Sequence, residues 1–221
     1  VKTDKDLLLQ YQTDYETNPA MFHLPEAAVS PANAQEISDI VKLANEYDFP
    51  ITVRSGGTSL ADGAIPVCGG LVLCMDRLNK IIELNEEGMY MVVEAGVRTI
   101  DIQNLAHEKG LMYAGDPCSG DSCCIGGNGA TNAGGNRAVK YGTTRDQIYA
   151  LEVVTPTGKI AQLGKRLHKM TAGYPLEKIV VGSEGTLGII TQLTIKLVPL
   201  PKATAHVLAV FPSAEQALSL V

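Results

Sequence analysis

Two glycine-rich segments hold the residues of this chain that could do chemistry. Residues 53–60 read Val-Arg-Ser-Gly-Gly-Thr-Ser-Leu, and residues 125–135 read Ile-Gly-Gly-Asn-Gly-Ala-Thr-Asn-Ala-Gly-Gly. Because glycine can adopt positive φ, such segments can turn successive backbone N–H groups into one concavity where an anion binds. Two of them in a chain of 221 residues predict a ligand with an extended, phosphate-bearing chain, such as a dinucleotide cofactor.

Two familiar nucleotide motifs do not account for these segments. The dinucleotide fingerprint G-x-G-x-x-G needs a strand before it and a helix after it. Its nearest match is residues 127–132, where the last glycine is missing and no strand is expected before it. A Walker-type loop needs Gly-Lys followed by Ser or Thr, which the chain does not contain. The sequence therefore supports neither a Rossmann nor a P-loop nucleotide site.

The composition excludes several classes of partner. A net charge of −6 without a basic cluster, together with 5% aromatic residues and no tryptophan, argues against nucleic acid binding. No apolar run approaches the roughly 18–20 residues of a membrane span, and the charged first residues are unlike a signal peptide. We therefore expect a cytoplasmic protein with no membrane span and no nucleic acid partner.

Cysteine and histidine give no sign of a metal centre or a proton-transfer group. The five cysteines lack the spacing of paired C-x-x-C ligands, so we expect reduced thiols and no metal. The four histidines lie outside every motif, and a lone histidine is more often a surface or core residue than a catalyst. The catalytic residues are left unassigned.

The elements that must position the glycine-rich segments follow from periodicity and capping. Asn33, with Glu36 three residues later, predicts a helix over 33–47, and a second helix is expected over 99–109. A short helix is expected within residues 1–24, and another begins at 213–217. The expected strands cover residues 51–53, 71–75, 81–84, 89–93, 148–154, 159–162, 193–197 and 206–211.

Two hairpins are expected among these strands, with turns at 85–88 and 155–158. In the strand over 193–197, Leu193 should face inward with Ile195 and Leu197, while Thr194 and Lys196 face outward. Hairpins mixed with isolated helices predict an α+β fold rather than a regular βαβ repeat.

A family resemblance rests on four ordered stretches. Residues 53–64, with their Arg-Ser-Gly-Gly-Thr-Ser-Leu core, resemble the first flavin loop of the FAD-binding PCMH-type domain of the vanillyl-alcohol-oxidase superfamily. Within it, the chain is similar to the glycolate oxidase and D-lactate dehydrogenase branch of FAD-linked 2-hydroxyacid dehydrogenases. The other stretches are 116–128, 130–146 and 181–191, and the similarity covers roughly residues 25–201.

The resemblance implies a domain organisation. After an N-terminal arm (1–24), two α+β subdomains (about 25–84 and 85–201) hold FAD between them, and residues 202–221 begin a substrate-binding cap domain that is otherwise missing. Some relatives attach FAD covalently through a histidine in the first loop. This chain has Gly57-Thr58-Ser59 there, so we expect non-covalent FAD.

The resemblance also implies the cofactor-binding residues. The first loop supplies backbone amides for the pyrophosphate, which they can bind without lysines. Its residues are Val53, Arg54, Ser55, Gly56, Gly57, Thr58, Ser59 and Leu60. Those expected along the flavin and ribityl chain are Asp116, Pro117, Ser122, Cys124, Ile125, Gly126, Gly127, Asn128, Ala130, Thr131, Asn132, Ala133 and Gly134. Those expected to hold the adenosine portion and close the site are Glu184, Gly185, Gly188, Ile189 and Ile190.

The implied activity is oxidation of a 2-hydroxy acid, glycolate- or D-lactate-like, by hydride transfer to FAD. In the family, the base and the carboxylate-binding arginine lie mainly on the cap, so we expect little turnover from this chain alone. Two alternatives stay open. The chain can be a non-catalytic FAD-binding or electron-transfer subunit that needs a partner chain, or a related fold such as that of cell-wall precursor reductases. The sequence does not identify the electron acceptor.

Overall fold

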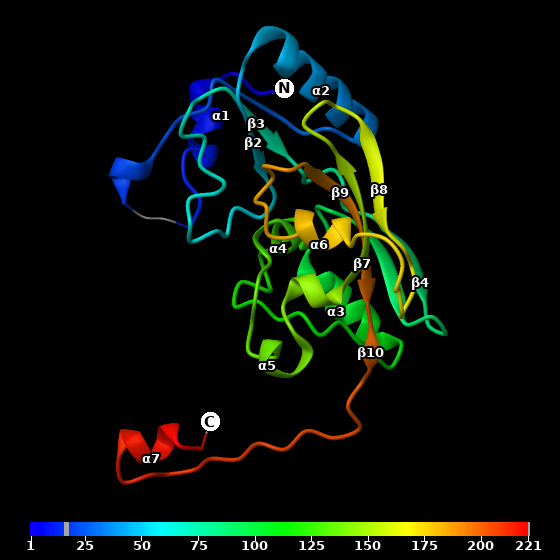
Figure 1. Cartoon of the computed structure of the whole chain (residues 1–221). Coiled ribbons are helices and arrows are strands. Elements are labelled where there is room, and N and C mark those ends of the chain that lie inside the picture. Colours follow the sequence, from blue (N-terminus) through cyan, green and yellow to red (C-terminus); the bar gives the residue numbers. More distant parts are fainter. Residues whose placement is uncertain (16–17, 221) are drawn as a thin grey trace.

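The chain forms a three-stranded and then a five-stranded β-sheet, together with a third sheet of two short strands (Figure 1). The computed structural model describes residues 1–15 and 18–220. The first sheet contains β1 (Ala27–Val29), β2 (Ile51–Arg54) and β3 (Leu71–Cys74). β3 lies in the middle, and both of its neighbours run parallel to it.

Helix α2 (Ala34–Tyr47) connects β1 to β2, and its predicted N-terminus is confirmed. The Asn33 side chain accepts a hydrogen bond from the amide of Glu36 at 2.9 Å, and Glu36 Oε2 accepts one from the amide of Ala32 at 2.8 Å. Ser38 Oγ donates to the carbonyl of Gly158 at 2.5 Å. This bond fixes α2 against a turn of the second sheet.

The second sheet has five antiparallel strands in the order β4-β5-β9-β7-β8. Their bounds are Ile81–Asn85 for β4, Tyr90–Glu94 for β5, Ile148–Val154 for β7, Ile160–Gly164 for β8 and Ile189–Lys196 for β9. Both predicted hairpins are confirmed, because β4 pairs with β5 and β7 pairs with β8. β9, the last of these strands in sequence, lies between β5 and β7 and completes the sheet.

The remaining elements are short, apart from the predicted helix α3. They are α1 (Lys5–Leu8), η1 (Leu9–Tyr11), η2 (Pro19–Met21), α3 (Thr99–Glu108), β6 (Leu111–Met112), α4 (Ile125–Thr131), α5 (Ala138–Tyr141), η3 (Thr144–Gln147), α6 (Leu176–Val180), β10 (Val198–Pro199) and α7 (Ala214–Leu218). The two-residue strands β6 and β10 pair with each other.

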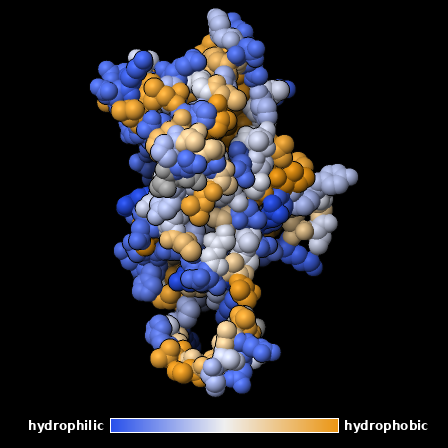
Figure 2. Space-filling model, turned by 90° about the vertical axis from the view of Figure 1, so that its left-hand side faces the viewer, coloured by the Kyte–Doolittle hydropathy of each residue, from blue (hydrophilic) through white to orange (hydrophobic). Residues whose placement is uncertain are grey.

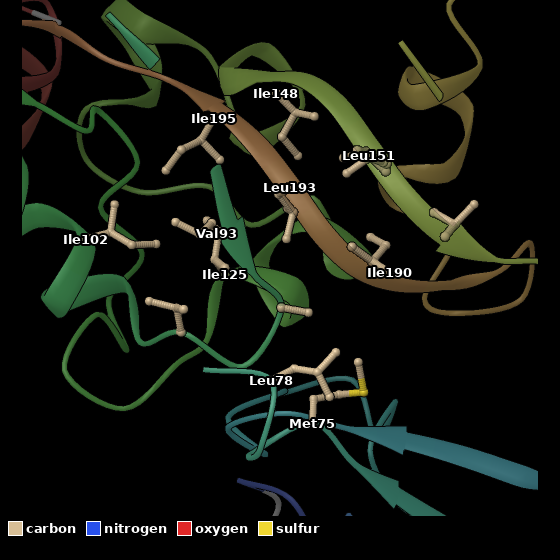
Figure 3. Packing of buried hydrophobic residues seen from close by; sticks show 14 of the residues in the cluster. Met75, Leu78, Val93, Ile102, Ile125, Ile148, Leu151, Ile190, Leu193 and Ile195 are labelled. Carbon is tan, nitrogen blue, oxygen red and sulfur yellow. The ribbon is translucent and has the colours of Figure 1, made fainter. Parts of the chain in front are cut away.

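The main hydrophobic core lies between the second sheet and helices α3 and α4. Figure 3 shows Ile102 of α3 and Ile125 of α4 on the same side of the sheet as Val93, Leu193 and Ile195. All five side chains are fully or almost fully buried. Burial of such side chains contributes about 1.5–3 kcal/mol each. The core therefore holds the second glycine-rich segment rigidly against the sheet.

The second glycine-rich segment is partly helical, because residues 125–131 form α4. The amide of Ile125 donates to the carbonyl of Val97, and that of Gly126 donates to the carbonyl of Ala95. A Cβ atom added at Gly126 would lie 2.5 Å from Cβ of Ala95. Glycine at this position thus permits a close approach of the helix to the end of β5.

The prediction that Thr194 faces outward is wrong, because Thr194 is only 5% exposed. It pairs with Val92 on β5 and with Ala150 on β7. Six of the eight residues of β9 are buried, so this strand is covered on both faces and alternation does not report exposure here.

The prediction of a strand over residues 206–211 is also wrong, since this segment is extended but pairs with no strand among the described residues. Residues 201–210 are all exposed. Figures 1 and 2 show the C-terminal segment leaving the body and carrying apolar residues. Strand propensity forms no strand without a partner. The helix expected at 213–217 is present as α7.

The change from the first sheet to the second comes within residues 75–80, because β4 already belongs to the second sheet. The subdomain boundary expected near residue 84 would therefore fall inside the β4–β5 hairpin. The segment expected to be an N-terminal arm packs against the first sheet, where Leu8 and Tyr11 are 2% and 8% exposed.

Candidate functional site

A cleft of about 390 Å³ lies between the two sheets. Its walls come from the loop after β2, the segment 119–124, helix α4 and the loop before β9. This volume is within the range of about 300–1,000 Å³ that is usual for small-molecule and cofactor sites. Among the described residues that line it there is no lysine or arginine, and the one carboxylate is that of Glu184.

The loop after β2 presents a row of unpaired backbone donors. In the part of the chain that the structure describes, the backbone amides of residues 56–60 donate no hydrogen bond to a protein acceptor. The next amide, that of Ala61, donates to Ser59 Oγ at 3.1 Å. Buried or ordered backbone donors are normally paired, so a run of N–H groups without a protein acceptor at a cleft is available to bind an anion.

Two glycines are required for the shape of this loop. Gly57 has φ +64°, and a Cβ atom there would overlap the guanidinium of Arg54. A Cβ atom at Gly56 would lie 2.5 Å from the carbonyl oxygen of Ser122. Gly57 therefore lets the loop fold over the Arg54 side chain, and Gly56 lets it contact the backbone at Ser122. Larger residues at these two positions would prevent both contacts.

The opposite wall is fixed by backbone hydrogen bonds between α4 and the loop before β9. The amide of Gly182 donates to the carbonyl of Gly129 at 3.0 Å, and that of Glu184 donates to the carbonyl of Ala130 at 2.9 Å. Glu184 itself has φ +53°. Its Oε2 atom lies 3.1 Å from the position of a Cβ atom on Gly63, so its side chain reaches from one wall to the other.

Helix α4 is also tied to α3 by a buried polar contact. Asn128 Nδ2 donates to Thr99 Oγ1 at 2.6 Å, and Thr99 Oγ1 lies 3.3 Å from the sulfur of Cys123. Both Asn128 and Cys123 line the cleft. Since a buried amide costs free energy unless it is hydrogen-bonded, this contact sets the position of α4.

Burial lowers the reactivity of one thiol at the cleft, that of Cys124. All five cysteines are unpaired, and burial raises the pKa of Cys124 to about 11. Its thiol is therefore protonated at neutral pH and is a weak nucleophile. No group of three or more His, Cys, Asp or Glu residues in the described ranges is arranged to hold a metal ion.

Most of the predicted site residues meet at this cleft, although they come from three distant segments. Those that line it are Val53, Ser55, Gly56, Gly57, Thr58, Ser59, Leu60, Cys124, Gly126, Gly127, Asn128, Ala130, Thr131, Ala133, Glu184, Gly185, Gly188, Ile189 and Ile190.

Seven predicted residues do not line the cleft. They are Arg54, Asp116, Pro117, Ser122, Ile125, Asn132 and Gly134. The Asp116 side chain accepts a hydrogen bond from the amide of Arg137 at 3.0 Å, and that of Asn132 accepts one from the amide of Arg145 at 2.9 Å. These two side chains support the loop that follows α4.

Six residues line the cleft without having been predicted: Ala61, Gly63, Ala64, Met75, Ser119 and Cys123. Three of them simply continue the first glycine-rich loop. Met75 follows β3, whose register pairs Cys74 with Arg54, so it lies beside the start of the loop after β2. The parallel pairing of β2 with β3, had it been predicted, would have identified Met75, because parallel strands end at the same edge of a sheet.

Comparison with protein families gives a match to a domain described as "FAD binding domain" over residues 25–164, which is more than half of the chain. The chain belongs to this FAD-binding domain family. Its cleft fits that cofactor, because amides without a protein acceptor lie along it and glycines leave room there for a ligand close to the backbone. FAD is the cofactor of this domain.

Curated relatives of this FAD-binding domain include oxidoreductases. The chain is 42% identical to the glycolate oxidase subunit GlcD of Bacillus subtilis (strain 168), covering 94% of this chain and 44% of that protein. It is 40% identical to a D-lactate dehydrogenase of Anaerostipes hadrus, covering 89% and 41%. The FAD-binding domain described here thus spans less than half of the length of these relatives.

A solved structure of an alkyldihydroxyacetonephosphate synthase has the same fold, with a TM-score of 0.79 and 27% identity over 91% of this chain and 38% of that one. In the described part of this FAD-binding domain, no helix is both long and apolar enough to cross a membrane.

Proposed function

We propose that this chain is the FAD-binding part of a flavin-dependent dehydrogenase or oxidase that oxidises a 2-hydroxy acid, glycolate- or D-lactate-like. The observation that carries the proposal is the row of unpaired amides at residues 56–60, which faces a cleft without lysine or arginine. A diphosphate carries about two negative charges, and an ordered row of N–H groups can stabilise it without a cation.

The remaining residues of the cleft have complementary roles in this proposal. The apolar and glycine-rich wall formed by α4 would lie along the flavin and ribityl chain. Glu184 repels a phosphate, so its carboxylate is suited to the hydroxyl groups of the adenosine ribose. Bound FAD supplies a hydride acceptor for the hydroxyl-bearing carbon of the substrate. The protein orients that acceptor and excludes water from it.

FAD binds non-covalently in this proposal. The first loop offers Thr58 and Ser59 rather than histidine, and the Cys124 thiol is protonated at neutral pH because burial raises its pKa. Neither a hydroxyl nor a neutral thiol is a ready nucleophile towards a flavin ring.

The chain alone is not expected to turn over substrate efficiently. Apart from the two thiols Cys123 and Cys124, Glu184 is the one titratable group among the described residues that line the cleft. The base and the group that binds the substrate carboxylate must then come from parts of the relatives that this chain does not span. We place the protein in the cytoplasm, where its five unpaired thiols would stay reduced.

A cofactor titration tests the proposal. Purified apo-protein should bind one FAD, giving absorbance bands at about 370 and 450 nm that remain with the protein on gel filtration and are released by denaturation. With glycolate or D-lactate and a dye acceptor, turnover should be slow or absent for this chain and present when the missing part is supplied. Failure of FAD to bind would contradict the proposal, as would efficient oxidation by the chain alone.

A non-catalytic FAD-binding subunit is the second candidate, and one observation favours it. The Bacillus subtilis relative is named as a subunit of its oxidase. In that case FAD binding would persist, but activity would require co-purification with a separate chain. Fusing the chain to the remaining length of a relative would not then restore turnover.

A further inference from the structure

The side chain of Arg54 turns away from the cleft and lies beneath the loop after β2. Its Nη1 atom donates to the carbonyl of Thr13 at 2.7 Å and to that of Ala64 at 3.4 Å. The guanidinium occupies the space under Gly57, where a Cβ atom would overlap it. One side chain thus connects the N-terminal segment, the curled part of the loop and the end of the loop.

The N-terminal segment offers a rigid support for this connection. Leu8 and Tyr11 are buried against β1 and β3, and Lys2 Nζ donates to the hydroxyl of Tyr11 at 2.6 Å. The amide of Tyr15 then donates to the carbonyl of Ser59 at 3.3 Å, within the loop itself. These residues precede residue 25, where the match to the FAD-binding family begins.

The loop has few other restraints. Gly56, Leu60, Ala61 and Gly63 are exposed, and the amides of residues 56–60 make no bond within the described protein. Apart from the contact of Gly56 with the Ser122 backbone, its order therefore depends on the contacts below it. A loop that is ordered before binding avoids the entropy cost of immobilisation when the ligand binds, so its affinity for the ligand is higher.

We propose that Arg54 and the N-terminal segment 11–15 are a positioning device for the cofactor, holding loop 55–64 in the conformation that binds the FAD diphosphate. This proposal rests on the FAD-binding site described above. Arg54 acts through the loop and touches no part of the cofactor. Residues outside the family match thereby become part of the cofactor site.

The test compares FAD affinity with loop order in matched variants. Arg54→Met keeps the length of the side chain but removes its donors, whereas Arg54→Lys keeps the charge and one donor group. Arg98→Met is the control, because Arg98 is exposed and pairs with Asp101 at 2.8 Å, outside the cleft. For each protein, the FAD dissociation constant is measured by calorimetry. The rate at which chymotrypsin cuts the apo-protein after the exposed Leu60 is measured by mass spectrometry.

We expect Arg54→Met to bind FAD at least about tenfold more weakly, equivalent to about 1.4 kcal/mol, and to be cut faster after Leu60. Arg54→Lys should recover part of both effects, and Arg98→Met should match the wild type. Should Arg54→Met fail to fold, Arg54→Lys carries the comparison, with weaker binding and faster cleavage than the control.

Two results would overturn the proposal: FAD affinity within twofold of wild type in the folded Arg54 variants, or weakened binding without any change in cleavage. The second result would mean that Arg54 contacts FAD directly. If the wild type binds no FAD, the proposed function fails, while the cleavage rates still decide whether Arg54 orders the loop.

Discussion

Gly126 is required for close packing and not for an unusual backbone conformation. Its φ is not positive, but a Cβ atom there would lie 2.5 Å from Cβ of Ala95 and 2.7 Å from its carbonyl oxygen. We expect Gly126→Ala to lower the free energy of unfolding by about 1–3 kcal/mol, because backbone on the other side cannot move away. Urea denaturation of the apo-protein measures this loss.

Gly134 provides the matched control for that substitution, since a Cβ atom there meets nothing within 4 Å and its φ is not positive. Gly134→Ala should change the free energy of unfolding by less than about 0.5 kcal/mol. Equal losses for the two variants would show that α4 is not pressed against residue 95.

Cys124 should respond to alkali in a way that an exposed thiol does not. Burial raises its pKa from the ordinary 9.0 to about 11, because the thiolate is poorly solvated there. Iodoacetamide at pH 8 should therefore modify the exposed Cys118 and spare Cys124 in the apo-protein, with labelling of Cys124 rising only as the pH approaches 11. Mass spectrometry of the labelled peptides gives both rates.

The raised pKa of Cys124 also makes the free energy of unfolding depend on pH. The folded protein holds the Cys124 proton more tightly than the unfolded chain, so its stabilising contribution is complete below about pH 9 and is lost as the pH rises towards 11. Comparable labelling of the two thiols at pH 8 would contradict this assignment.

Among the elements, α2 positions the first sheet against the second and depends on its N-cap. Replacing Asn33 by alanine removes the acceptor for the amide of Glu36, now bonded at 2.9 Å. The free energy of unfolding should fall by about 1 kcal/mol. Glu46→Ala, on the exposed side of the same helix, should have an effect below about 0.5 kcal/mol. Thermal and urea denaturation of both variants measure the difference, and an equal effect would show that the Asn33 hydrogen bond makes no specific contribution to stability.

For the molecule as a whole, the C-terminal segment is expected to contribute nothing to the fold of the body. Val207, Leu208 and Val210 are 86–92% exposed, and no residue from 201 to 210 is buried. Ending the chain after Pro201 should leave the free energy of unfolding within about 0.5 kcal/mol and reduce self-association, because exposed apolar surface is removed. Sedimentation velocity and urea denaturation measure these two effects.

Ending the chain after Thr191 should, by contrast with ending it after Pro201, destroy the fold. It removes most of β9, the strand between β5 and β7, and should abolish cooperative unfolding. A stable product from this shorter chain would show that the second sheet does not need its central strand.

Local signals in the sequence were sufficient for elements whose stabilising contacts lie within a few residues. The Asn33 cap, the two hairpins and the curled Gly56-Gly57 loop each depend on hydrogen bonds or φ values of neighbouring residues, and each is found where the sequence predicts it. The ordered motifs likewise indicated which segments would form one site.

Contacts between distant segments were decided only by the tertiary structure. The burial of Thr194 follows from the insertion of β9 between β5 and β7, and Arg54 reaches Thr13, 41 residues earlier in the chain. Met75 enters the cleft because β3 lies parallel to β2. A sequence pattern reports which face of an element is apolar, but packing determines what lies against that face, because many arrangements bury similar areas and only three-dimensional fit distinguishes them.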